Sequence, residues 1–146
     1  MSTEGVSVSG RIEEVNESEL AWLASLLAHL REDGIAVDAI AISFAFERSR
    51  RSWFGLPEHD RPDPNAFINS IGAGLGDVLV KSLDLRWVVA TDEHGTELAL
   101  HGEPGNILLY PMNAVGKRWV DDDRQSLAQF VEEVSSHVWR LRGPAR

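Results

Sequence analysis

Apolar side chains recur every three or four positions in several stretches of the chain, and this spacing predicts helices. The first predicted helix begins at Asn16, which stands three residues before Glu19 as in a capping box, and ends at Gly34. One of its faces carries Leu20, Leu23, Ala24 and Leu27. The opposite face carries Trp22 and Leu26. Because both faces are apolar, the helix is either sandwiched in the core or offers a contact surface.

Residues 38–53 fit two patterns. Large apolar residues alternate with small ones, which is typical of a strand: Ile40, Ile42, Phe44 and Phe46. Several of them also share one helical face, and the alanines between them favour a helix. We therefore expect a helix, with Arg48 and Arg51 at its polar end. The Gly- and Pro-containing stretch after it predicts a loop.

A third helix is predicted from about Pro64 to Ser82, and two glycines, Gly72 and Gly76, flank its apolar face. Glycine inside a helix costs about 0.5–1 kcal/mol relative to alanine, so we expect another element to approach closely there. A phosphate-binding loop is the competing interpretation. It is disfavoured because these glycines follow residues that already form a helix, and no Lys-Ser/Thr pair comes after them.

Strands are predicted at residues 85–91, 96–100 and 106–110. Alternation places Trp87 on the same side as Val89, facing the core. The first two strands are joined by a tight turn that ends at Gly95. A turn or short helix over residues 112–118 and a final amphipathic helix complete the chain.

These elements predict an α+β fold in one domain, residues 16–143, after a flexible lead-in, residues 1–15. Three N-terminal helices precede a three-stranded antiparallel meander and a C-terminal helix. The final helix carries Trp139 off its main apolar stripe, so Trp139 is a candidate neighbour of Trp22 on one surface.

The composition of the chain disfavours several classes of function. The 146 residues carry a net charge of −9, which disfavours binding to nucleic acid. The absence of cysteine excludes disulfides and thiolate metal sites. No apolar run is long enough to span a membrane and no secretory signal is evident, so we expect a cytoplasmic protein without a membrane partner. The basic cluster Arg48, Arg50 and Arg51 is interpreted as a solvated helix face.

Polar residues with possible chemistry lie near the turn between the first two strands. Asp92, Glu93 and His94 precede Glu97 and His101, but their spacing is not that of a metal-ligand set, and we expect no metal and no cofactor. A polar hairpin tip is the commoner use of such residues. The pair Lys117 and Arg118 is harder to assign: it could form ion pairs with Asp92 or Glu93, or bind an anionic ligand or partner. Asp77 and Lys81 are expected to form a surface ion pair.

One ordered series of residues resembles a known family. The series runs through Asn65, Ile71-Gly72, Leu75-Gly76-Asp77, Leu85, Trp87-Val88-Val89, Thr91-Asp92-Glu93, Gly95-Thr96, Ala99, Pro111-Met112-Asn113, Val115 and Lys117-Arg118. It is similar to a bacterial family of domains of unknown function, the one numbered 3806, over about residues 60–120. The resemblance implies a small cytosolic domain without an assigned reaction, and it provides no catalytic residue.

Two classes of function remain. The first is a non-catalytic protein-interaction module, an adaptor, chaperone-like or immunity-type protein, that docks a partner or a second copy through Trp22, Leu26 and Trp139. The alternative is a small-molecule-binding protein or enzyme, which requires Asp92 and Glu93 to converge with Lys117 and Arg118 on a concave pocket. The absence of a recognisable catalytic set favours the module.

Overall fold

The computed structural model describes residues 11–143, and within them the chain forms one antiparallel four-stranded sheet with the order β1-β2-β3-β4. The strands are β1 (Arg11–Glu14), β2 (Arg86–Asp92), β3 (Gly95–Gly102) and β4 (Ile107–Leu109). The predicted meander is confirmed as β2, β3 and β4. The prediction of three strands is wrong, because β1 pairs with the free edge of β2.

The additional strand lies in the stretch that was predicted to be a flexible lead-in; residues 1–10 of that stretch lie outside the described residues. All four residues of β1 are exposed. A strand without a buried face needs no alternation of apolar and polar residues, and its sequence, Arg-Ile-Glu-Glu, did not indicate a strand. Its backbone pairs from Arg11 opposite Thr91 to Glu14 opposite Val88. Backbone hydrogen bonds, which any sequence can make, therefore define this strand.

Five α-helices surround the sheet within the described part of the chain: α1 (Glu17–Glu32), α2 (Ala39–Phe54), α3 (Asn65–Leu83), α4 (Pro111–Val120) and α5 (Leu127–Arg142). A 3-10 turn, η1 (Glu58–Asp60), lies between α2 and α3. The predicted α+β class is confirmed, and so is the helix over residues 38–53. The predicted capping box also forms, since Asn16 and Glu19 each accept a hydrogen bond from the other's backbone N–H. No helix among the described residues is long and apolar enough to cross a membrane.

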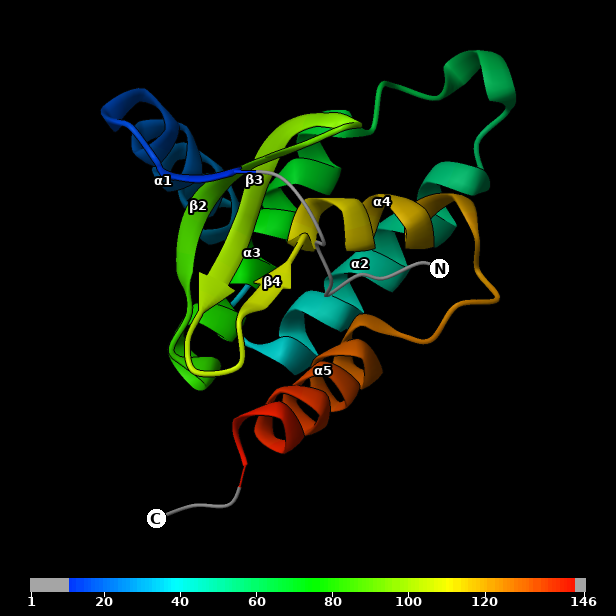
Figure 1. The fold of residues 1–146 in the computed structure, drawn as a ribbon. Helices are drawn as coiled ribbons and strands as arrows, with labels where there is room; N and C mark the ends of the chain where they lie inside the picture. The colour runs from blue at the N-terminus through cyan, green and yellow to red at the C-terminus, as the bar shows by residue number, and fades with distance from the viewer. Residues whose placement is uncertain (1–10, 144–146) are drawn as a thin grey trace.

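Helix α3 lies behind the sheet in Figure 1 and contacts α1, α2, α4 and α5 as well as β2. Its glycines make these contacts possible. A Cβ added at Gly72 would stand 2.6 Å from Met112 of α4, and one at Gly74 would stand 2.6 Å from Leu30 of α1. At Gly76 it would stand 2.2 Å from the ring of Trp87. The prediction that the glycines serve close packing is confirmed. Each of the three glycines contacts a side chain from a different element: α4, α1 and β2.

The main core forms between α3, the other helices and one face of the sheet. Trp87 packs against this core from β2, as predicted. The opposite face of the sheet carries a smaller buried cluster: Val88, Ala90, Ala99 and Leu108. The predicted ion pair between Asp77 and Lys81 is confirmed, with 2.9 Å between the carboxylate and ammonium groups.

The predicted division of α1 into two apolar faces is wrong. Leu26 is buried in a cluster with Leu23 and Ala73, whereas Leu20, assigned to the opposite face, is half exposed. Leu30 packs beside Gly74 and shares one helical face with Leu23 and Leu26, so the buried face of α1 is centred on these three residues. Trp22 and Leu20 are left on the two edges of that face, where both remain partly exposed.

Candidate functional site

A groove of about 400 Å³ opens where α1, the β2–β3 hairpin, α3 and α4 meet. We call it the α1–hairpin groove. It is lined by Glu19, Trp22, Asn69, Val89, Thr96, Glu97, Leu98 and Met112. These residues come from five different elements, so the groove exists only in the folded chain.

The apolar part of the groove rests on a buried cluster of side chains. Leu98 and Met112 line the groove and pack against Leu23, Leu26 and Ala73. Met112 reaches this position because Gly72 has no side chain to displace it. Trp22 forms part of the wall and keeps 41% of its surface exposed. An aromatic ring with this exposure beside an apolar floor is a typical anchor point for a ligand or partner.

Glu97 borders the groove on the opposite side of β3 from Leu98, and its ionisation is less favourable than that of an ordinary glutamate. The Glu97 residue is exposed, but partial desolvation of its carboxyl raises the pKa, the Asp92 carboxylate raises it further, and the Lys117 ammonium opposes both effects. Asp92, Glu97 and Lys117 therefore lie within electrostatic reach of one another. A positive charge brought to Glu97 by a ligand would favour its ionised form.

The hairpin that carries Glu97 is held in shape by local hydrogen bonds. The backbone N–H of His94 donates to the Asp92 carboxylate over 2.7 Å, and the Thr91 and Thr96 hydroxyls lie 3.0 Å apart across the two strands. At the tip, the Glu93 and His94 side chains are largely exposed. Glu19 is also fixed, because its carboxylate accepts the Asn16 N–H over 2.7 Å. Glu19 is thus positioned by the backbone around it, and hydrogen bonds of its neighbours shape the hairpin that carries Glu97.

The structure brings together predicted residues that were assigned to different sites. Trp22, proposed as a docking residue, lines the same groove as Glu97, and Glu97 interacts with Asp92 and Lys117. Leu26 lies beneath the groove in the core, and Glu93 lies at the hairpin tip. The sequence reasoning considered Glu97 only as a metal ligand. It missed Asn69, Thr96 and Met112, because only the tertiary packing of α3 and α4 brings them to the hairpin.

Arg118 has a structural role that the sequence did not indicate. Only 4% of its surface is exposed, and its guanidinium donates to the carbonyls of Ala114 (2.9 Å) and Gln125 (3.1 Å). The same group stacks 4.6 Å from the centre of the Phe130 ring. It therefore ties α4 to the start of α5, whereas its neighbour Lys117 is only half-buried and acts on Glu97.

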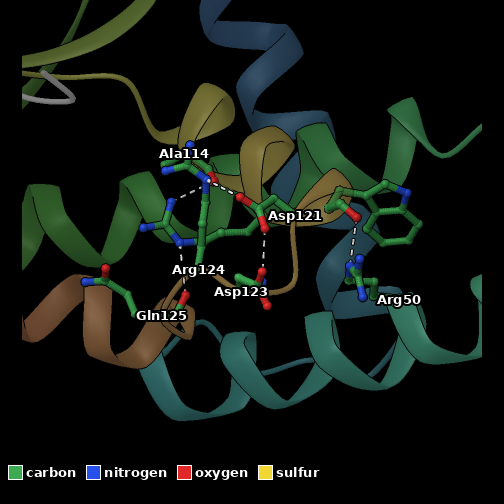
Figure 2. A network of polar contacts seen from close by, with 8 residues as sticks. Arg50, Ala114, Asp121, Asp123, Arg124 and Gln125 are labelled. Carbon is green, nitrogen blue, oxygen red and sulfur yellow. Dashed lines mark hydrogen bonds and ion pairs between the residues drawn. The ribbon is translucent and has the colours of Figure 1, made fainter. Parts of the chain in front are cut away.

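Figure 2 shows the polar network that follows α4. The backbone N–H of Asp123 donates to the Asp121 carboxylate, which also pairs with Arg124 over 3.6 Å. Arg50 reaches across from α2 and donates to the carbonyl of Trp119 over 2.7 Å. Arg50 was predicted to lie on a solvated face, and this part of the prediction is wrong, because its side chain is largely buried between α2 and α4.

Trp139 lies far from the α1–hairpin groove. It belongs to α5, and Figure 1 places α1 and α5 at opposite ends of the molecule. Trp139 is also exposed, but it shares no surface with Trp22. Within residues 11–143, no three His, Asp or Glu side chains come close enough together to hold a metal ion.

Fold and groove together define a small α+β domain with a surface groove beside a glycine-containing helix. The sequence profile of a family described as a domain of unknown function (DUF3806) matches residues 57–130, about half of the chain, and the chain belongs to this family. The match spans α3, the strands from β2 to β4 and α4, and it contains every residue that lines the groove except Glu19 and Trp22. No curated protein and no solved structure matches the chain.

Proposed function

We propose that this protein is a non-catalytic interaction module that binds a segment of a partner protein in the α1–hairpin groove. The observation that carries the proposal is the exposed ring of Trp22 beside the apolar floor formed by Leu98 and Met112. Tryptophan is among the residues that contribute most to protein interfaces, because it buries a large area with little loss of side-chain entropy.

The lining of the groove specifies the chemistry of the bound segment. The described residues that line it include two acids and no base: Glu19 lies on α1, and Glu97 lies at the border, on the opposite side of β3 from Leu98. A segment with an apolar side chain for the floor and a long basic side chain that reaches Glu97 at the border of the groove fits both features. The basic side chain would also relieve the raised pKa of Glu97 by favouring the ionised carboxylate.

The surroundings of the groove support binding more than catalysis. General acid–base chemistry requires a titratable group that is free to exchange a proton with a substrate. Asp92 is engaged by the backbone of the hairpin, and His94 and Glu93 extend into solvent at its tip. Glu97, whose pKa is raised, lies on the opposite side of β3 from the groove floor. Solvent-exposed polar side chains at a hairpin tip are the ordinary property of a turn.

The experiment compares two exposed tryptophans. Tagged wild type, Trp22→Ala and Trp139→Ala proteins are purified from the native cell, and the associated proteins are quantified by mass spectrometry. We expect at least one protein to accompany the wild type and Trp139→Ala but to be lost from Trp22→Ala. Equal retention by all three proteins would contradict the proposal, provided that circular dichroism shows Trp22→Ala to be folded.

A small-molecule-binding function is the second candidate. Its support is the volume of the groove, about 400 Å³, which lies at the lower end of the range for ligand pockets, and the opposite charges of Glu97 and Lys117 at one place. Native mass spectrometry of protein purified from the same cells distinguishes the two functions. A stoichiometric mass of a few hundred daltons that Trp22→Ala loses and Trp139→Ala keeps would favour the small molecule.

A further inference from the structure

The first half of β3 lies at an open edge of the sheet. β4 pairs with β3 from Leu100 to Gly102, and the chain then enters α4, which packs against α3. Figure 1 shows the short β4 beside the last part of β3. Residues 95–99 pair with β2 on one side, but no described strand pairs with them on the other. An edge of this kind presents backbone donors and acceptors to another chain.

The register of the hairpin shows which backbone groups face this open side. Asp92 and Gly95 flank the two-residue turn, so they form the hydrogen-bonded pair that closes it. Such pairs alternate along the strands with closer pairs that share no backbone hydrogen bond, and Thr91 and Thr96, whose hydroxyls lie 3.0 Å apart, are the first of these. Thr96 and Leu98 therefore direct their N–H and C=O away from β2. Within residues 11–143, no hydrogen bond joins these outward groups to another residue.

The lining of the α1–hairpin groove shows that the groove reaches this edge. Three consecutive residues of β3 line it: Thr96, Glu97 and Leu98. Successive side chains of a strand point to opposite faces, so a groove on one face alone would be lined by every second residue. The groove therefore includes the edge of β3 itself. Thr96 and Glu97 are exposed and Leu98 is half-buried, which leaves this part of the strand accessible.

We propose that the segment bound in the α1–hairpin groove is extended and adds to the sheet as a strand, pairing with the N–H and C=O groups of Thr96 and Leu98. This inference rests on the proposed function, because it specifies how a partner segment is held in the groove. In strand addition, backbone hydrogen bonds contribute affinity and alternate side chains contribute selectivity.

An added strand meets different chemistry on its two faces. Its residues opposite Thr96 and Leu98 direct their side chains to the face of Leu98 and Met112, the apolar floor of the groove. The residue between them directs its side chain to the other face, beside the Glu97 carboxylate. A segment that alternates apolar and basic residues therefore fits the edge, the floor and the charge together.

The outer edge of β1, the strand at the other end of the sheet, lacks these features. Its sequence, Arg-Ile-Glu-Glu, carries three charged residues, and none of its residues lines the groove. Charged side chains on an edge strand discourage pairing with another chain. The free half of β3 is therefore the edge that combines open backbone groups with a binding groove.

Backbone-methylated peptides test the pairing. The probe is the acetylated and amidated peptide Val-Lys-Val-Lys-Val-Lys, and titration calorimetry measures its binding. We expect it to bind the wild type and to bind Trp22→Ala more weakly. In the proposed arrangement the valine N–H groups face β3 and the lysine N–H groups face away from it. N-methylation of the valines should therefore weaken binding about tenfold or more, whereas N-methylation of the lysines should change it little.

The outcomes separate this inference from the proposed function. Equal binding of the two methylated peptides would overturn strand addition but leave a groove that binds a segment in another conformation. Equal binding of the parent peptide to the wild type and Trp22→Ala would place the peptide outside the groove and overturn the inference. So would a wild type that does not bind the peptide at about 1 mM. The proposed function is then decided by the capture experiment with Trp22→Ala and Trp139→Ala.

Proline substitutions test the same edge from the side of the protein. Thr96→Pro removes an outward N–H of β3, and a strand tolerates proline where the N–H faces away from its neighbour. Ile12→Pro is the matched control on β1: Ile12 stands opposite Ala90, whose backbone groups pair with β3, so its N–H also faces outward. With both variants folded by circular dichroism, Thr96→Pro should bind the peptide about tenfold more weakly than Ile12→Pro. Equal binding by the two variants would overturn the proposal.

Discussion

Two tryptophans on the same side of α3 end in different environments. The ring of Trp87 occupies the space that Gly76 leaves empty and packs against the main core. The ring of Trp22 borders the α1–hairpin groove, and 41% of the surface of this residue is exposed. The same side-chain chemistry thus serves stability at one position and remains available for binding at the other. Gly76 of α3 provides the space that the Trp87 ring fills.

The largest expected effect concerns stability. Replacing Trp87 with Ala removes a ring from a space shaped for it, and we expect a loss of about 3 kcal/mol in the free energy of unfolding. Trp22→Ala should cost about 1 kcal/mol or less, because its ring is partly exposed. Denaturant unfolding of both variants measures the difference. Equal losses would show that Trp22 is as much a core residue as Trp87, and the comparison would fail.

This comparison also shows how much the sequence could predict. The glycines of α3 indicated close packing, because glycine is costly within a helix unless another element uses the space. Their partners, Met112, Leu30 and Trp87, could not be identified, since they come from distant parts of the chain. The same limit applied to α1, where the packing of Leu30 beside Gly74 and of Leu26 beside Ala73 depends on the position of α3.

The candidate site was predictable only in parts. Trp22, Asp92 and Lys117 were recognised as unusual, but nothing in their spacing indicated that Glu97 would connect them. The neighbours Lys117 and Arg118 could not be told apart, because both are bases on one short helix. Their roles differ because Arg118 is buried and Lys117 is only partly buried. The Arg118 guanidinium donates hydrogen bonds to the carbonyls of Ala114 and Gln125.

A smaller effect sharpens the description of the groove. Because the pKa of Glu97 is raised above its ordinary value of 4.5, the folded protein holds the proton more firmly than the unfolded chain does. The contribution of Glu97 to the stability of the wild type should therefore fall as the pH rises from 4.5 through the raised pKa. Glu97→Gln lacks this ionisation, so the variant should gain stability over the wild type in that range and keep the gain at neutral pH.

Unfolding curves of the wild type and Glu97→Gln at a series of pH values measure this effect. Glu93→Gln is the control, since Glu93 lies on the same hairpin with an exposed side chain. A Glu97→Gln protein that is less stable than the wild type at neutral pH would mean that the carboxylate is well paired in the fold. In that case Glu97 would not be available to a basic ligand.

The most direct test of the central claim is the affinity of the captured partner for two charge-reversed proteins. Glu97→Lys places a positive charge at the border of the α1–hairpin groove, and Glu93→Lys places the same charge at the exposed tip of the same hairpin. Titration calorimetry against the partner should show a dissociation constant raised about tenfold or more by Glu97→Lys and nearly unchanged by Glu93→Lys. If both substitutions leave the affinity unchanged, or both weaken it equally, the partner does not bind in this groove.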